Sequence, residues 1–284
     1  MTRAANHPLT WGADPYADAL RSGRGPLFLR RPDGWLLPLE VERWCAGADA
    51  ADRSALRRCE GAVLDIGCGP GRLVAALADR GRRALGIDVS EAAVARTAAA
   101  GGTALCRSVF DSLPEEGSWD TALLLDGNIG IGGDPRALLL RTAELVTPSG
   151  LLIVETIAAD VDERVQVRVE GRAAAGYGGS RARNGSGALF PWARVGTPAL
   201  LRHAAATGWV SVEQWSVPGP RDYRPEDAER RFVALRRRAR AAVPRSRGAA
   251  VRASSNTADT ANRAAVSSSQ RERKTSPGSP VADV

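Results

Sequence analysis

The chain has 284 residues, 44% of them hydrophobic, and a formal net charge of +7. This length and composition suit one large or two small soluble domains with a sizeable core. No run of about 18 apolar residues occurs, and the N-terminal sequence lacks the apolar segment of a secretory signal, so we expect a cytoplasmic protein that does not cross a membrane.

The positive charge is concentrated at one end of the chain. Residues 236–284 contain eleven Lys or Arg and three Asp or Glu, so this segment carries +8 and the rest of the chain carries −1. A basic tail adds weak, non-specific attraction to polyanions but does not define a binding module, so we expect no nucleic-acid partner. From residue 239 onward large apolar side chains are scarce, which predicts a disordered basic tail at 239–284.

Cysteine and histidine usage argues against a metal centre. His7 and His203 are the only histidines, too few for a His-rich cluster, so we assign no role to His7 and expect His203 to be an ordinary helix residue. The four cysteines are widely spaced and form no CxxC pair: Cys45, Cys59, Cys68 and Cys106. Free thiols are expected, with neither a zinc knuckle nor a disulfide framework.

Composition divides the chain into regions. Residues 1–60 look irregular, with many prolines and aromatics, and are expected to form an N-terminal lid or acceptor segment. Apolar runs alternate with helical patterns through 61–157 and again through 197–238, which is typical of a parallel sheet with crossover helices. We therefore expect one main domain at 61–238, with a small cap inserted at 158–196.

Seven strands are expected in the main domain. In chain order they are residues 62–66, 83–89, 103–109, 119–126, 151–156, 209–217 and 230–237. Ser90 and the pair Asp134-Pro135 carry helix-start signals between strands. The predicted fold is α/β, a seven-stranded, doubly wound and mostly parallel sheet whose last two strands form a hairpin at its edge.

Residues 63–73 read VLDIGCGPGRL, a strand followed by a glycine-rich turn and the start of a helix. Glycines at Gly67, Gly69 and Gly71 leave the main chain bare, so a ligand can approach it, and the helix N-terminus offers N–H groups to an anion. Pyrophosphate and carboxylate both suit such a loop. A dinucleotide fingerprint, however, requires a third glycine where this chain has Arg72.

This stretch resembles the first motif of class I S-adenosylmethionine-dependent methyltransferases, in which an acid stands two residues before the first glycine. The resemblance extends through 61–157 and more loosely through 197–238. It implies a Rossmann-like methyltransferase fold for the main domain and S-adenosyl-L-methionine as cofactor. It also implies cofactor-binding roles for the acid and the loop: Asp65, Gly67, Cys68, Gly69 and Gly71.

Two later stretches extend the resemblance. In IDVS (87–90), Asp88 and the adjacent Val89 stand where the family places an acid on the ribose diol, and a carboxylate can accept both hydroxyls. In FDSLP (110–114), Phe110 and Asp111 match the family's contacts to adenine. Taken singly, Asp88 also fits a loop acid before a helix, and Asp111 a turn residue.

The stretch DGNIGIGGDP (126–135) follows the fourth strand, whose end lies near the reacting methyl group in the family. Asp126 and Asn128 are therefore the candidate catalytic residues, which would orient the acceptor, and Asp126 is also a candidate cofactor contact. A plain strand-to-helix link explains the same glycines. The stretch lacks the DPPY-type tetrapeptide of enzymes that methylate amino groups of nucleic acids.

The inserted cap is expected to be a hairpin of residues 165–171 and 188–196 over the carboxyl edge of the sheet. Four aromatic residues are candidates for an acceptor wall, although ordinary packing is the better explanation for any one of them: Tyr16, Trp35, Phe190 and Trp192.

The sequence thus predicts a methyltransferase that acts on an oxygen or nitrogen of a small molecule, in keeping with secondary metabolism. A general base is optional, because positioning an acceptor against an activated methyl group supplies much of the rate. Two alternatives stay open. A nicotinamide-dependent oxidoreductase would need the third glycine and a Tyr/Lys or His catalytic pair, and a non-catalytic S-adenosylmethionine-binding protein would need neither.

Overall fold

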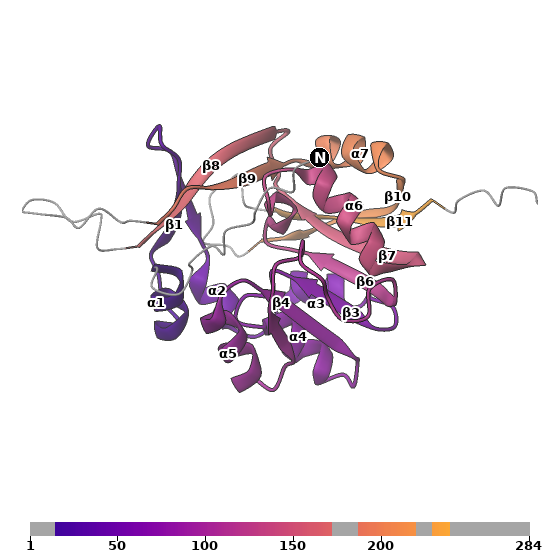
Figure 1. Cartoon of the computed structure of the whole chain (residues 1–284), viewed down its shortest axis with the longest axis horizontal. Coiled ribbons are helices and arrows are strands. Elements are labelled where there is room, and N and C mark those ends of the chain that lie inside the picture. Colours follow the sequence, from indigo (N-terminus) through magenta and orange to yellow (C-terminus); the bar gives the residue numbers. More distant parts are fainter. Residues whose placement is uncertain (1–14, 172–186, 220–228, 239–284) are drawn as a thin grey trace, which may run out of the picture. The chain divides into compact units, whose positions relative to one another are not determined.

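The computed structural model describes residues 15–171, 187–219 and 229–238. Within them, eleven strands form one seven-stranded and one four-stranded sheet (Figure 1). The predicted tail at 239–284, the loop at 172–186 and His7 lie outside the described residues. No helix in the described ranges is long and apolar enough to cross a membrane.

The larger sheet confirms the predicted fold class. Its strands in spatial order are β10 (Trp209–Pro218), β11 (Glu229–Arg237), β7 (Val146–Thr156), β6 (Trp119–Leu124), β3 (Val63–Ile66), β4 (Ala84–Asp88) and β5 (Ala104–Cys106). The five strands from β7 to β5 pair in parallel, whereas β11 is antiparallel to both neighbours. The hairpin predicted at the sheet edge is therefore confirmed as β10–β11.

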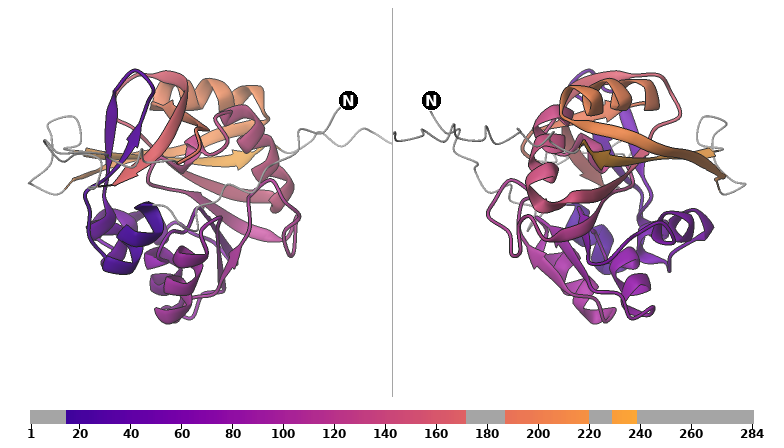
Figure 2. Two further views of the ribbon diagram at one scale, coloured as in Figure 1. Left: turned by 60° about the vertical axis from the view of Figure 1, so that its left-hand side comes forward. Right: turned by 90° about the vertical axis from the view of Figure 1, so that its right-hand side faces the viewer.

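Helices cover both faces of this sheet (Figure 2). On one face α6 (Pro135–Leu145) and α7 (Thr197–Ala206) share a core with Leu64, Ala122 and Leu152. On the other, α3 (Ala50–Leu56) and α4 (Arg72–Ala78) share a core with their strand neighbours Val63, Leu123 and Ile153. Successive residues of a strand point to opposite faces, so a strand covered on both sides has an almost continuously apolar sequence.

The smaller sheet is antiparallel throughout, in the order β2 (Leu36–Leu39), β1 (Leu27–Arg30), β8 (Asp162–Gly171) and β9 (Phe190–Val195). The predicted pairing of the two inserted strands is confirmed. The sequence did not indicate that β1 and β2, more than 120 residues earlier, extend them into a sheet.

The prediction that residues 1–60 are irregular was wrong for the described part. Besides β1, β2 and α3, it contains α1 (Pro15–Ser22) and α2 (Val41–Cys45). These elements have four to eight residues each, too few for a hydrophobic period to be recognised. The start of α3 did carry a signal, because Asp49 and Asp52 form a reciprocal capping box. The third predicted strand, 103–109, is also shorter, since β5 ends at Cys106.

Candidate functional site

A cavity of about 770 Å³ lies between the two sheets. Its floor consists of residues at the carboxyl ends of β3, β4, β5 and β6, and its wall of residues from α1, α2 and the smaller sheet. From β3 the chain builds the sheet outward to β4 and β5, and then returns to the other side of β3 with β6. Ligands of open parallel sheets bind at such a switch point.

The three glycines of the β3–α4 loop have positive φ angles, but their surroundings differ. A Cβ on Gly67 would lie 2.6 Å from Asn128 Nδ2, and one on Gly71 2.5 Å from the Thr97 side chain. On Gly69 the nearest atom would be the Tyr16 hydroxyl oxygen at 3.5 Å. Gly67 and Gly71 therefore permit close packing within the protein, and Gly69 leaves space for a ligand against bare backbone.

Asp88, at the end of β4, lines the cavity beside this loop. Its Oδ2 accepts a hydrogen bond from the Gly69 N–H and its Oδ1 accepts one from the Ser90 N–H, each at 2.9 Å. Burial raises the pKa of Asp88 to about 6, against the opposing effect of these hydrogen bonds. An ionised carboxylate has about four acceptor positions, so Asp88 keeps capacity for donors on a ligand.

Asp65 lies beneath the loop and does not line the cavity. Its side chain is buried, and within the described chain its Oδ2 has no hydrogen-bond partner. Burial raises the pKa of Asp65 to about 7, although Arg72 pulls it down. A buried carboxylate oxygen without a hydrogen-bond partner is rare, so Asp65 Oδ2 is a feature that the protein alone does not explain.

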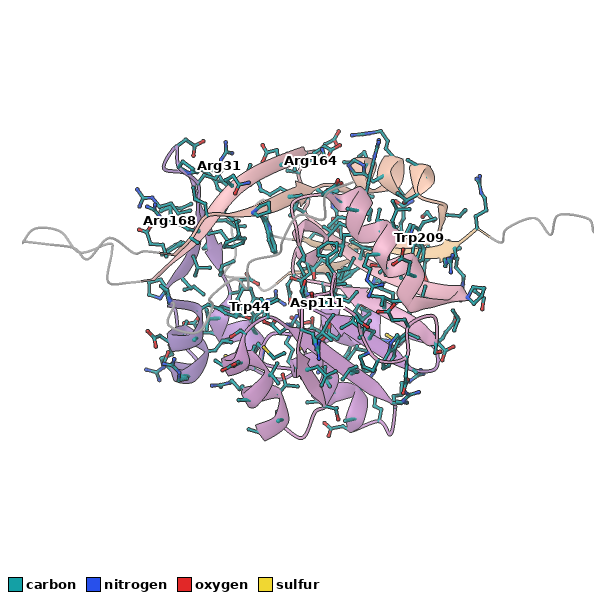
Figure 3. The ribbon with its side chains drawn as sticks, in the orientation of Figure 1. Arg31, Trp44, Asp111, Arg164, Arg168 and Trp209 are labelled. Carbon is teal, nitrogen blue, oxygen red and sulfur yellow. The ribbon has the colours of Figure 1, made fainter. Side chains whose placement is uncertain are left out.

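The remaining predicted cofactor contacts sit at one end of the floor. Cys68, Val89, Phe110 and Asp111 all line the cavity, and Figure 3 labels Asp111. Asp111 Oδ2 accepts from the Ser108 N–H at 3.2 Å, so its carboxylate closes a local turn. The alternative that Asp111 is a turn residue therefore holds alongside its place on the cavity edge.

Asp126 lies at the other end, immediately after β6, and has a left-handed φ of +57°. Three guanidinium groups surround its carboxylate: that of Arg43, that of Arg72 at 2.7 Å and that of Arg230 at 3.5 Å. Burial alone would raise the pKa of Asp126, but these cations hold it well below its usual range. The carboxylate is therefore a fixed negative charge.

The same arginines continue into a buried ionic network. Arg72 binds Asp52 through Nε and Nη2 at 2.8 and 3.0 Å, and Arg230 reaches Asp52 Oδ1 at 3.0 Å. Arg230 also binds Glu155 at 2.7 and 2.8 Å, and Glu155 accepts from the Asp126 N–H at 2.9 Å. The network joins α3, α4, β6, β7 and β11 under the site. The sequence did not indicate this network. There, Arg72 stood out only as the residue in place of the third glycine of a dinucleotide fingerprint.

Asn128 begins the short 3-10 helix η2 (Asn128–Gly130) and lines the cavity. Its Nδ2 donates to the carbonyl oxygens of Ile66 and Gly67, each at 2.9 Å. Both amide hydrogens are thus used to hold the glycine loop. A Cβ on Gly130 would lie 2.2 Å from the Ala193 carbonyl oxygen, so this glycine permits close packing of η2 against β9.

The wall of the cavity is aromatic and aliphatic. Of the four predicted aromatics, Tyr16, Phe190 and Trp192 line it. Trp35 does not, and instead packs under the guanidinium of Arg194, 4.7 Å from its ring centroid. The sequence did not indicate the other lining residues: Leu29, Leu39, Trp44 and Pro191.

His203 is buried away from the cavity, as an ordinary packed histidine. Its Nδ1 accepts from Arg136 Nε at 3.2 Å, and its Nε2 lies 2.9 Å from Asp162 Oδ1. Across the described chain, no group of three or more His, Cys, Asp or Glu side chains converges to hold a metal ion.

Residues 63–150 match the family model of a methyltransferase domain, a range that runs from β3 into β7 and includes the residues of the cavity floor. Over these residues the chain is similar to a methyltransferase domain. The carboxylate after β4 and the glycine loop after β3 are the parts of this domain that meet at the cavity.

Solved structures with the same fold include other methyltransferases. An S-adenosylmethionine-dependent methyltransferase from Bacteroides fragilis, in complex with S-adenosyl-L-homocysteine, is 19% identical, with a TM-score of 0.59 over 79% of this chain and 93% of that one. The 1,6-didemethyltoxoflavin-N1-methyltransferase of Burkholderia thailandensis is 17% identical, with a TM-score of 0.52 over 84% and 93%. The CcbJ methyltransferase of Streptomyces caelestis is 18% identical, with a TM-score of 0.51 over 82% and 99%. No curated protein matches the sequence.

Around the methyltransferase domain, the chain adds its own cavity wall. The lining residues of α1, β1, β2, α2 and β9 all fall outside the matched range. The wall is therefore the part of the site that the family match leaves undescribed.

Proposed function

We propose that this chain transfers a methyl group from S-adenosyl-L-methionine to a small-molecule acceptor. The observation that carries the proposal is the meeting of Gly69 and Asp88 on one cavity, where open backbone and a carboxylate lie side by side. Bare peptide groups suit an amino-acid moiety, and the carboxylate suits a sugar diol.

The residues of the floor fit such a cofactor. Asp88 would hold the ribose hydroxyls with its remaining acceptor positions, and Phe110 and Asp111 would border the adenine. From beneath the loop, the charge of Asp65 would favour the cofactor's ammonium group, in keeping with a buried Oδ2 that has no hydrogen-bond partner within the described chain. When bound, the cofactor supplies an activated methyl group, and the protein supplies the orientation of the acceptor.

Asp126 and Asn128 remain the proposed residues near the transferred methyl group, as positioning residues. The carboxylate of Asp126 is neutralised by three arginines, which makes it a poor proton acceptor. The amide of Asn128 fixes the glycine loop. Both therefore act by fixing the floor against which the reactants are held.

A small-molecule acceptor fits the dimensions and charge of the site. A cavity of about 770 Å³ lies within the range of about 300–1,000 Å³ typical of small-molecule sites. The neighbour from Burkholderia thailandensis is named as an N1-methyltransferase of 1,6-didemethyltoxoflavin. Methylation of nitrogen or oxygen in secondary metabolism is consistent with such a site.

Calorimetric titration with S-adenosylhomocysteine, in parallel with NADH, tests the cofactor. We expect saturable binding of S-adenosylhomocysteine and none of NADH; the reverse result would support an oxidoreductase. Turnover of S-adenosylmethionine with a panel of acceptors then distinguishes an enzyme from a protein that only binds the cofactor. Absence of methyl transfer to every acceptor, with tight cofactor binding, would contradict catalysis.

A further inference from the structure

The wall of the cavity has an unusual composition for a surface that must hold a reacting molecule. Its members are Tyr16, Leu29, Leu39, Trp44, Phe190, Pro191 and Trp192. They include no carboxylate, amine, imidazole or thiol. Among the described residues, a substrate on this side of the cavity therefore meets no charged group, and the Tyr16 hydroxyl is the only ionisable group of the wall.

The aromatic rings of the wall are held in fixed pairs. Tyr16 and Trp44 pack edge to face with ring centroids 6.4 Å apart, and Phe190 and Trp192 do so at 6.3 Å. Aromatic pairs in this geometry are favourable and leave few rotamers free. They form a preorganised surface that suits stacking of a flat ring, at little entropic cost on binding.

The carboxylates of the floor are already engaged. Asp88 accepts two backbone hydrogen bonds, and Asp111 accepts one. Asp126 is bound by three arginines. In the proposed complex the first two also contact the cofactor. None of the three is placed to remove a proton from an acceptor held on the wall.

The other ionisable side chains on the described lining of the cavity are also not general bases. Burial raises the pKa of the Cys68 and Cys106 thiols, so both stay protonated at neutral pH. The Tyr16 hydroxyl lies beside Gly69, where the methionine part of the cofactor would bind in the proposed complex. Arg72 and Arg107 are cations and cannot act as bases.

We infer that the acceptor is a flat, mainly apolar aromatic molecule whose reacting atom already has an available lone pair at neutral pH, and that the described residues of the cavity position it without acting as a general base. Ring nitrogens, thiolates and acidic phenols have this property. The inference deepens the proposed function and rests on it.

The chemistry balances without a base at the moment of transfer. The acceptor's lone pair forms the new bond to the methyl carbon while the carbon–sulfur bond breaks and its electron pair stays on sulfur. With an anionic acceptor the sulfonium charge is neutralised; with a neutral ring nitrogen it passes to the methylated product, which releases any N–H proton to solvent. No electron donor or acceptor is needed. An acidic phenol loses its proton to solvent before this step.

Two phenols of similar shape and different acidity test the inference: 7-hydroxycoumarin, which ionises near neutral pH, and the less acidic 2-naphthol. We expect kcat/KM at pH 7 to be about tenfold or more higher for 7-hydroxycoumarin. We also expect the midpoint of each pH profile to follow the ionisation of that acceptor. A midpoint common to both phenols would reveal a base on the protein and overturn the inference.

Binding to the protein saturated with S-adenosylhomocysteine gives a second measurement that needs no turnover. We expect both phenols and benzimidazole to bind, and glucose and serine not to bind. Binding of the polar probes alone, or of no aromatic probe, would overturn the inference. Failure of S-adenosylhomocysteine itself to bind would instead refute the proposed function, so the two failures are distinguishable.

Two tryptophans of the same region provide a matched pair of variants. Trp192→Leu removes a ring of the wall, whereas Trp35→Leu removes one that packs outside the cavity. Affinity for 7-hydroxycoumarin should fall about tenfold in the first variant and stay unchanged in the second. Trp44→Leu serves if Trp192→Leu does not fold, and equal losses in the wall and control variants would contradict stacking on the wall.

Tyr16→Phe tests the one hydroxyl on the wall. Because we assign it no proton transfer, the variant should keep the pH profile of each phenol. A profile that loses its dependence on pH in this variant would make Tyr16 the base.

Discussion

The floor and the wall of the cavity are stabilised by different forces. The floor contains ion pairs and directed hydrogen bonds, from the arginines around Asp126 to the backbone donors on Asp88. The wall is held by packing of aromatic and aliphatic groups. Directed bonds fix one geometry, whereas apolar packing tolerates changes of shape at similar volume. The floor therefore suits a ligand of one fixed geometry, and the wall suits ligands of differing shape.

The largest effect is expected from breaking the ionic network under the floor. Arg72→Ala would leave the buried carboxylates of Asp52 and Asp126 short of a cation, at a cost of about 3–5 kcal/mol of unfolding free energy. Urea denaturation measures this loss. The matched control Arg21→Ala breaks an exposed pair with Asp18 and should cost about 0.5 kcal/mol or less. Equal losses would show that the network contributes no more than a surface pair.

A smaller effect is expected from the floor's contact with the ribose. Asp88→Ala should weaken binding of S-adenosylhomocysteine by about 1–3 kcal/mol, because a charged acceptor is lost. Calorimetry measures the change. Leu39→Ala, on the wall, should leave this affinity within about twofold while weakening acceptor binding. The contrast between floor and wall would be refuted if Leu39→Ala weakened cofactor binding as much as Asp88→Ala.

The sequence predicted the floor better than the wall, for a physical reason. Glycines that expose backbone and acids at strand ends are local signals, so Gly69 and Asp88 could be identified from a few neighbouring residues. The wall depends on pairing of β1 with β8, whose partners Arg30 and Arg168 are 138 positions apart. The position of Trp44 on the cavity depends on the same long-range assembly, and no local sequence pattern predicts it.

The ionic network shows a second limit of sequence reasoning. Arg230 and Asp52 are 178 residues apart and lie on different elements. In the sequence, an arginine in an apolar strand looks like a solvent-exposed position, because burial of a charge costs free energy unless partners are present. Those partners become evident only when α3, β7 and β11 are brought together.

The glycine loop allows a test of whether a ligand binds against the exposed backbone of Gly69. Gly69→Ala and Gly81→Ala both place a Cβ on a residue with positive φ, +55° and +66°, so both should lose about 1 kcal/mol of stability. A Cβ on Gly69 faces the cavity, whereas one on Gly81 meets nothing within 4 Å and lies outside it. Only Gly69→Ala should weaken S-adenosylhomocysteine binding, by about tenfold. Unchanged affinity would mean that no ligand approaches this residue.

The smallest effect is the proton balance of binding. The pKa of Asp65 is raised to about 7 and that of Asp88 to about 6, so both are partly protonated in the free protein near pH 6.5. A ligand ammonium and ligand hydroxyls favour the ionised carboxylates and lower both pKa values, so binding releases protons. Affinity should therefore rise from about pH 5 to 7.5 and then level off. Calorimetry of S-adenosylhomocysteine at pH 6.5 in phosphate and in Tris measures the release from the difference in heats.

Asp65→Asn separates the two carboxylates, because it should reduce the proton release and leave the part due to Asp88. The same variant has an effect on the free protein. The folded-state pKa of Asp65, about 7, lies above the unfolded value of about 3.9, so its ionisation lowers the unfolding free energy as pH rises between them. Asp65→Asn should therefore be more stable than the parent at pH 8 and gain nothing at pH 4. Proton uptake on binding would contradict a ligand ammonium near Asp65. A loss of stability at pH 8 would mean that Arg72 and its neighbours already compensate the ionised carboxylate in the free protein.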